Sequence, residues 1–232
     1  MNATERQPLS LRTPGRRENL FMVLTGIFLG SLIIANVLVF KLWSFFGIVL
    51  IAGIIPYPVT FLATDLLSEI YGRKWASRVV WAGFVASLWV LTVIVIAGRV
   101  PAIPVGDRTV EQTQAIYQTV FGASVRAIAA SMIAYLVAQL IDVHLFHFWR
   151  RLTNGKHLWL RNNGSTIISQ LVDTVLVVSI LFAGQMPFEQ LLTLIGASYL
   201  FKLLIALIDT PLFYLGVAIC RRYGIEPAPI DE

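Results

Sequence analysis

Ionisable side chains lie inside long apolar runs in the second half of this chain. They are Asp142, Asp173 and Asp209, together with Arg126 and Lys202. A charged group that faces lipid costs at least about 2.5–3.5 kcal/mol at the middle of a membrane span. If these runs cross a membrane, their charges must face the interior of a helix bundle. There they could form internal ion pairs, or they could line a polar cavity for a solute or an ion.

Helical spacing places the polar residues of each run on one face. Side chains separated by three, four, seven or eight residues share a face of an α-helix. The stripes consist of Thr166, Gln170, Asp173 and Thr174, of Gln139 and Asp142, and of Ser198, Lys202 and Asp209. Three such stripes on otherwise apolar helices predict a polar pocket inside a bundle.

A second group of charged residues lies at the C-terminal end of an earlier apolar run. The segment TDLLSEIYGRK places Asp65 and Glu69 one helical turn apart, and Arg73, Lys74 and Arg78 follow closely. Two interpretations are open for the two acids. They could form a local salt-bridge latch with the three cations, or they could act as an inner gate or in cation handling below the main pocket.

The composition indicates an all-α integral membrane protein. Of the 232 residues, 57% are hydrophobic and only 13% are charged, with a mean hydropathy of +0.75. Soluble domains carry about 25% charged residues, so this chain cannot cover a large surface that faces water. The net charge of +5 is better explained by the orientation of a membrane protein than by binding to nucleic acid. Cys220 is the only cysteine, which excludes a disulfide within the chain.

Six apolar runs are long enough to predict six transmembrane helices, since a crossing needs about 20 residues. Pro56 and Pro58 predict a break or a tight kink in the second helix. The helices are expected at residues 20–40, 46–64, 79–98, 117–148, 165–183 and 188–220, with a loop at 99–115. The expected domains are a disordered cytoplasmic tail (1–18), a six-helix transmembrane domain (19–221) and a short cytoplasmic tail (222–232).

The distribution of lysine and arginine predicts that both termini are cytoplasmic. With six spans in that orientation, thirteen cationic residues face the cytoplasm, whereas Lys41, Arg99 and Arg108 face the outside. This agrees with the excess of positive charge in the cytoplasmic loops of membrane proteins. An odd number of spans would destroy the asymmetry.

Signals for an enzyme are weak. The chain has no phosphate-binding loop, no serine-hydrolase elbow and no zinc-protease motif. His144 and His147 share a helix face near Asp142 but have no further histidine or cysteine ligand nearby. We therefore expect no catalytic residue, no metal and no cofactor.

Four segments resemble the queuosine-precursor transporter family, also called the vitamin-uptake transporter family. They are YPVTFLATDLLSEIYGRKWA (57–76), GKHLWLRNNGSTIISQLVDT (155–174), IANVLVFKL (34–42) and QLIDVHLFH (139–147). Pro56 departs from the pattern, in which Pro58 is the expected proline. The resemblance implies a six-span protein of the bacterial inner membrane, similar in plan to the substrate-binding subunits of energy-coupling-factor importers. Its implied substrates are 7-deazaguanine bases, and its link to RNA is metabolic, without contact to nucleic acid.

The chemistry of such a base suits the polar stripes. One carboxylate, of Asp173 or Asp209, could accept both the N1–H and the 2-amino group. The 6-oxo group needs a donor, and the flat ring needs an aromatic face. We expect substrate binding by Asn36, Tyr57, Phe61, Gln170, Asp173, Lys202 and Asp209. We expect gating or coupling by Asp65, Glu69, Arg126, Asp142 and Arg161.

Other interpretations remain open at this stage. The chain could be a substrate-binding subunit that needs a separate ATPase module, or a membrane scaffold whose charges only tie helices together. The residues Arg161–Asn163 could gate the inner mouth or cap the fifth helix, for which Ser165 and Thr166 are typical starting residues. Energy coupling and a homodimer are equally undetermined.

Overall fold

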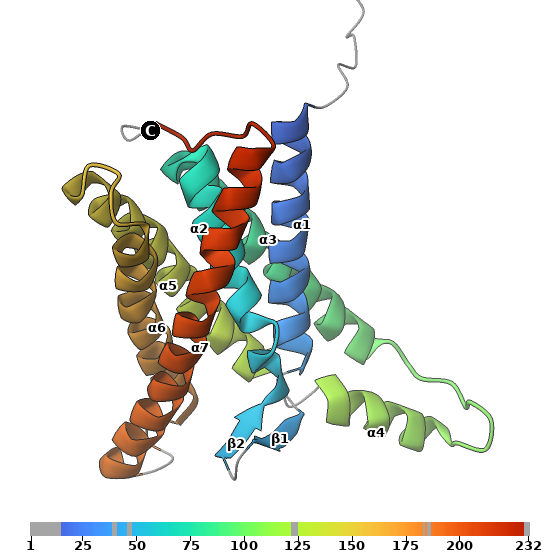
Figure 1. The fold of residues 1–232 in the computed structure, drawn as a ribbon. Coiled ribbons are helices and arrows are strands. Elements are labelled where there is room, and N and C mark those ends of the chain that lie inside the picture. Colours follow the sequence, from blue (N-terminus) through green and yellow to red (C-terminus); the bar gives the residue numbers. More distant parts are fainter. Residues whose placement is uncertain are drawn as a thin grey trace, which may run out of the picture.

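The computed structural model describes residues 15–38, 41–45, 48–121, 125–182, 184 and 187–229. Within them the chain forms seven α-helices, one 3₁₀ turn and one two-stranded hairpin (Figure 1). The elements are α1 (Arg16–Val37), β1 (Leu42–Phe45), β2 (Ile48–Ile51), η2 (Ala52–Ile54), α2 (Tyr57–Tyr71), α3 (Arg73–Arg99), α4 (Val110–Phe121), α5 (Val125–Leu152), α6 (Leu158–Phe182) and α7 (Phe188–Arg222).

Five helices are long and apolar enough to cross a membrane: α1, α3, α5, α6 and α7. They run roughly side by side in Figure 1, where α1, α3 and α6 run away from the end drawn at the top and α5 and α7 run toward it. The helix α2 also runs along the bundle, but its 15 residues span only about 22 Å at 1.5 Å per residue. The prediction of a helical membrane protein is therefore confirmed, whereas one of the six expected helices is too short to cross alone.

The second predicted helix is wrong in its first half. The strands β1 and β2 pair antiparallel, with Leu42 opposite Ile51, and η2 follows directly. Pro56 is the N-cap of α2, and Pro58 is its second residue. A proline at the start of a helix sacrifices no intrahelical hydrogen bond, because the first amides have no partner there anyway. The two prolines therefore begin a helix and do not kink one.

The fourth predicted span is two helices. The helix α4 begins after Thr109, whose hydroxyl accepts a hydrogen bond from the Gln112 amide (3.3 Å), while the Gln112 side chain accepts one from the Thr109 amide (3.0 Å). This reciprocal pair is the pattern of a capping box. Tyr117 ties α4 to the end of α3 by donating to the Ile94 carbonyl at 2.5 Å. Part of the predicted loop 99–115 is therefore helical.

The ends of two further helices differ from the prediction. The helix α6 begins at Leu158, so Arg161, Asn162 and Asn163 lie in its first turns and do not cap it. Ser165 is inside the helix and donates back to the Asn162 carbonyl at 3.1 Å. At the N-terminal end, α1 begins at Arg16, so the last residues of the predicted tail are helical. Residues 1–14 and 230–232 lie outside the described residues.

The helix α2 lies at the centre of the bundle, and ten of its fifteen residues are buried. Around it, the core combines Phe28 of α1, Leu67 of α2, Val80 of α3, Phe146 of α5 and Phe213 of α7. Outward faces are apolar too, for example at the exposed tryptophans of α3. An apolar exterior around a partly polar centre is the arrangement that a bilayer requires, because charges are excluded from lipid contact.

The two ends of the bundle differ in charge. The start of α1, the α2–α3 junction, the α5–α6 junction and the end of α7 all lie at one end, at the top of Figure 1. Those segments carry Arg16, Arg17, Arg73, Lys74, Arg78, Arg150, Arg151, Lys156, Arg161, Arg221 and Arg222. We call this the basic end. Among the described segments of the other end, the cations are Lys41, Arg99 and Arg108.

Candidate functional site

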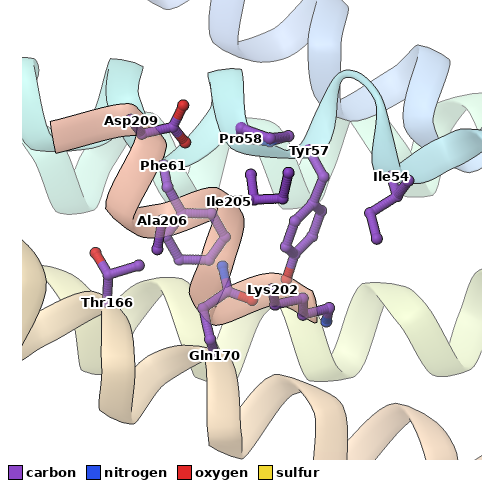
Figure 2. A pocket seen from close by; sticks show the side chains of 10 residues that line it. All are labelled: Ile54, Tyr57, Pro58, Phe61, Thr166, Gln170, Lys202, Ile205, Ala206 and Asp209. Atoms are coloured by element: carbon purple, nitrogen blue, oxygen red, sulfur yellow. The ribbon is translucent and has the colours of Figure 1, made fainter. Parts of the chain in front are cut away.

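A cavity lies between α2, α6 and α7, close to η2 (Figure 2). The empty space within it is about 290 Å³, part of it open to the outside. Figure 2 shows aromatic side chains entering from α2 and polar side chains from α6 and α7. Its lining consists of Ile54, Tyr57, Pro58, Phe61, Thr166, Gln170, Lys202, Ile205, Ala206 and Asp209. Five of the seven predicted substrate-binding residues are in this set.

A sixth predicted residue, Asp173, anchors the polar wall of the cavity. Its Oδ2 accepts a hydrogen bond from the Tyr57 hydroxyl at 2.6 Å and one from the Lys202 ammonium, also at 2.6 Å. The ammonium lies 4.7 Å from the centre of the Tyr57 ring, within cation–π range. The side chain of Asp173 is only 4% exposed, so its charge is compensated inside the protein. One carboxylate thereby fixes an aromatic residue of α2 and a cation of α7.

The aromatic wall comes from the first turns of α2. The rings of Tyr57 and Phe61 lie four residues apart on one helix face, with centroids 5.3 Å apart and planes tilted by 53°. The two prolines fix the start of α2. That start determines which residues of the helix face α7, and hence the positions of Tyr57 and Phe61. A flat, apolar ligand could pack against this pair.

Two acceptors in the cavity have no donor among the residues that the structure describes. Asp209 enters from α7, and no hydrogen bond or salt bridge from the described part of the chain reaches its carboxylate. The Oε1 atom of Gln170 is buried and also lacks a donor among the described residues. A polar group that is removed from water costs free energy unless it is hydrogen-bonded. The cavity is therefore prepared to accept hydrogen bonds from a ligand.

A second polar cluster lies near the basic end. Glu69 of α2 pairs with Arg161 of α6 at 2.5 Å, and both side chains are almost fully buried. Arg150 of α5 lies 3.9 Å from the other Glu69 oxygen and also donates to the Ala228 carbonyl, while the Ala228 amide donates to the Glu69 carbonyl at 3.0 Å. The segment after α7 is thus fastened over this cluster. Arg161 also donates to the Gly155 carbonyl at 3.0 Å.

Of the two open interpretations of Asp65 and Glu69, the local latch with the cations that follow them in sequence is wrong. The described salt bridges of Glu69 reach Arg161 and Arg150, from other helices, rather than the cations that follow it in sequence. Asp65 lies next to Asp142 of α5. The Ser169 hydroxyl of α6 donates to Asp142 Oδ1 at 2.9 Å. Residues of α2 therefore bind to α5 and α6, because α2 is enclosed by them.

One predicted substrate-binding residue, Asn36, does not line the cavity. Asn36 lines a separate, smaller cavity with Ser87 of α3 and apolar residues of α1, α3 and α5. It is thus separated from the residues with which a shared site was expected. Arg126 belongs to the first turn of α5, but its side chain lies outside the described part of the structure.

Several lining residues were absent from the predicted set. Thr166 belonged to the polar stripe of α6 and is four residues before Gln170, so its position was available from helical spacing. Ile54 could not be predicted as a lining residue, since it follows a hairpin that was itself not predicted. Arg150 and Ser169 were missed as partners of buried acids, because only tertiary packing brings α5 and α6 to α2.

The fold defines a multi-pass α-helical membrane protein with a partly enclosed cavity between α2, α6 and α7. The chain belongs to a transporter family, because residues 51–216 match the family model described as "Putative vitamin uptake transporter". The match covers α2, α6 and most of α7, and hence the whole lining of the cavity.

Three curated relatives carry a more specific description. A "Probable queuosine precursor transporter" of Bacillus subtilis (strain 168) is 35% identical over 78% of this chain and 77% of its own length. The "Queuosine precursor transporter" of Escherichia coli (strain K12) is 28% identical over 67% of each chain. A Haemophilus influenzae relative with the "Probable" description is 31% identical over 67% of this chain and 63% of its own. No solved structure matches the chain.

Proposed function

We propose that this protein imports queuosine precursors across the bacterial inner membrane. The candidate substrates are 7-cyano-7-deazaguanine, 7-aminomethyl-7-deazaguanine and queuine. The descriptions of the three relatives support this class of substrate. The observation that carries the proposal is the carboxylate of Asp209, which no described residue pairs and which shares a cavity with the aromatic pair of α2. The protein is then a transporter and not an enzyme.

The contacts of the cavity suggest a role for each polar group. Asp173 already accepts hydrogen bonds from Tyr57 and Lys202 through its Oδ2 atom. Asp209 is therefore the better acceptor for the adjacent N1–H and 2-amino donors of the base, as a charge-assisted pair. Lys202 lies in the same cavity and could donate to the 6-oxo group. The base would stack against the aromatic pair, and Gln170 would pair with a remaining edge of the ring.

The orientation follows from the charge of the two ends. We propose that the basic end faces the cytoplasm, so that both termini are cytoplasmic, in agreement with the positive-inside tendency. The sixth crossing would combine the hairpin, η2 and α2, enclosed by the longer helices. Irregular backbone at membrane depth is tolerated where protein buries it. The transmembrane domain would then extend over residues 19–221.

The Glu69–Arg161 pair is our candidate for the inner gate. It joins α2 to α6 at the basic end, on the cytoplasmic side of the cavity in the proposed orientation. Passage of a base to the cytoplasm would require these two helices to part at that point. Arg150 and the segment after α7 cover the pair further.

Uptake of labelled 7-cyano-7-deazaguanine tests the proposal in cells that cannot synthesise the base. Cells that express the protein should accumulate label, and excess unlabelled precursor should suppress it more strongly than guanine does. The purified protein in proteoliposomes distinguishes the alternative of a subunit that needs an ATPase module. Exchange of labelled base without ATP supports an autonomous transporter, whereas exchange only after addition of a membrane extract with ATP supports the alternative.

A further inference from the structure

Asp65 and Asp142 form a buried carboxyl pair that the recognition of the base does not use. Asp65 is 2% exposed and Asp142 is fully buried, and they meet where α2, α5 and α6 pack together. The described salt bridges of the chain involve neither residue. The pair therefore lacks a compensating cation in the described part of the structure.

The other groups around the pair do not stabilise a double negative charge. Glu69 and Asp209 add negative charge on the side of Asp65. The hydroxyls of Ser165, Thr166 and Ser169 face Asp142 from α6. Hydroxyls can compensate one carboxylate, but two neighbouring carboxylates without a cation repel each other, and a dry interior disfavours the charged form of both. The pair is therefore suited to bind one proton.

Unsatisfied atoms beside the pair support a site whose protonation changes. Asp65 Oδ1 and Asp142 Oδ2 have no donor among the described residues. Gln139, fully buried, accepts from the Thr64 hydroxyl at 3.2 Å in the same α2–α5 interface, yet its amide Nε2 has no described acceptor. A donor with no acceptor, one turn before Asp142, could stabilise a carboxylate once the proton leaves.

The pair lies directly beside the proposed substrate cavity. Thr166 lines the cavity and also faces Asp142. Phe61, one turn before Asp65 on α2, forms part of the aromatic wall. Displacement of α2 or α6 by a bound base would therefore change the contact between the carboxyl groups. Such a displacement alters the free energy of proton binding to the pair, because that free energy depends on the distance between the two carboxyl groups.

We propose that the Asp65–Asp142 pair is a proton-binding site that couples import of the base to entry of a proton. This inference rests on the proposed function. In each cycle a proton from the outer side forms an O–H bond on the ionised carboxylate. That bond breaks toward the cytoplasm, and a water molecule accepts the proton. The base itself is chemically unchanged, and no redox partner is needed.

Proteoliposomes with purified protein separate the coupling from transport itself. Exchange of labelled 7-cyano-7-deazaguanine at equal pH on both sides reports the proposed function and needs no driving force. An imposed pH gradient, with the acidic side facing the added base, reports coupling. We expect the native protein to exchange label and to accumulate it up to about tenfold under a gradient of one pH unit, since each unit corresponds to about 1.4 kcal/mol per proton. A pH-sensitive dye should record proton entry on addition of base.

Isosteric variants link the coupling to the pair. D142N and D65N should retain exchange but lose accumulation driven by the pH gradient, and D107N, at an exposed loop carboxylate, should behave as the native protein. If either pair variant fails to fold, S169A, which removes the donor to Asp142, should shift the pH dependence of accumulation. Absence of exchange in the native protein would overturn the proposed function. Exchange without acid-driven accumulation would overturn only the proton site, and so would accumulation driven by a sodium gradient instead. A native response in D142N, D65N and S169A would also overturn the proton site.

Discussion

The ammonium of Lys202 and the carboxylate of Asp173 lie 2.6 Å apart and join α7 to α6 beside the cavity. Their side chains are 16% and 4% exposed, so each depends on the other for compensation of its charge. The same carboxylate oxygen also holds the Tyr57 hydroxyl at 2.6 Å. This three-residue network positions both the aromatic wall and the cation of the cavity.

Replacement of Lys202 by methionine should destabilise the protein and weaken binding of the base. The change leaves Asp173 buried beside one remaining donor, and breaking a buried ion pair from one side costs about 3–5 kcal/mol. Unfolding in mixed micelles measures the loss. The double variant with K202M and D173N should recover most of the stability but not the binding. If K202M and the double variant lose equal stability, the pair does not act as a unit.

Replacement of Tyr57 by phenylalanine tests the hydroxyl separately from the ring. The variant retains the aromatic contact with Phe61 but removes one of the two donors to Asp173, so we expect a loss of about 1.5–3 kcal/mol in stability. Affinity for the base should fall less than in Y57A, which removes the stacking surface as well. Titration of both purified variants with 7-cyano-7-deazaguanine measures the difference. Equal affinities in Y57F and Y57A would argue against stacking.

Replacement of Glu69 by glutamine should loosen the basic end. Arg161 would then remain buried without its anionic partner, at a cost of about 3–5 kcal/mol. E111Q is a matched control, because Glu111 lies in the exposed helix α4 and has none of the described salt bridges. Limited proteolysis should cut E69Q earlier than E111Q in the loop between α5 and α6. Indistinguishable digestion of the two variants would contradict an inner gate held by Glu69 and Arg161.

Replacement of Gly53 by alanine should disturb the start of the cavity wall. A methyl group at this position would collide with the carbonyl of Ala35 in α1, since η2 approaches that backbone closely. Overpacking of this kind costs about 1–3 kcal/mol. G26A is the control, because a methyl group there meets nothing within 4 Å. Thermal unfolding in detergent should separate the two variants, and equal midpoints would show that η2 can move away.

The sequence predicted the helices where apolar length and polar spacing agreed. The stripe of Thr166, Gln170 and Asp173 faces the interior as expected, because a charged side chain has no low-energy alternative in lipid. The apolar run after Lys41 was predicted as the start of a helix. A short apolar run can form either a buried strand or a buried helix, and the periodicity of its residues does not distinguish the two. Its hairpin shifts the start of α2 to Tyr57 and thereby decides which residues face α7.

The partners of the buried charges were not predictable from one sequence. Glu69 has three cations close behind it, yet the described salt bridges link it to Arg161 and Arg150. Those contacts depend on how α5 and α6 enclose α2, and side-chain spacing within one helix carries no information about this. The same reason separates Asn36 from the cavity, because α1 turns its polar residue toward α3 and α5.

Binding of 7-cyano-7-deazaguanine to the purified protein and to D209N tests the central claim most directly. Asp209 is the cavity carboxylate that no described residue pairs, and Asn keeps its shape while replacing one acceptor by a donor. Loss of a bidentate, charge-assisted contact should weaken binding by about tenfold to a hundredfold, at about 1.4 kcal/mol per tenfold. D107N, at an exposed loop position, should bind as the native protein does. Native affinity in D209N, measured by calorimetry on a folded sample, would contradict recognition of the base in this cavity.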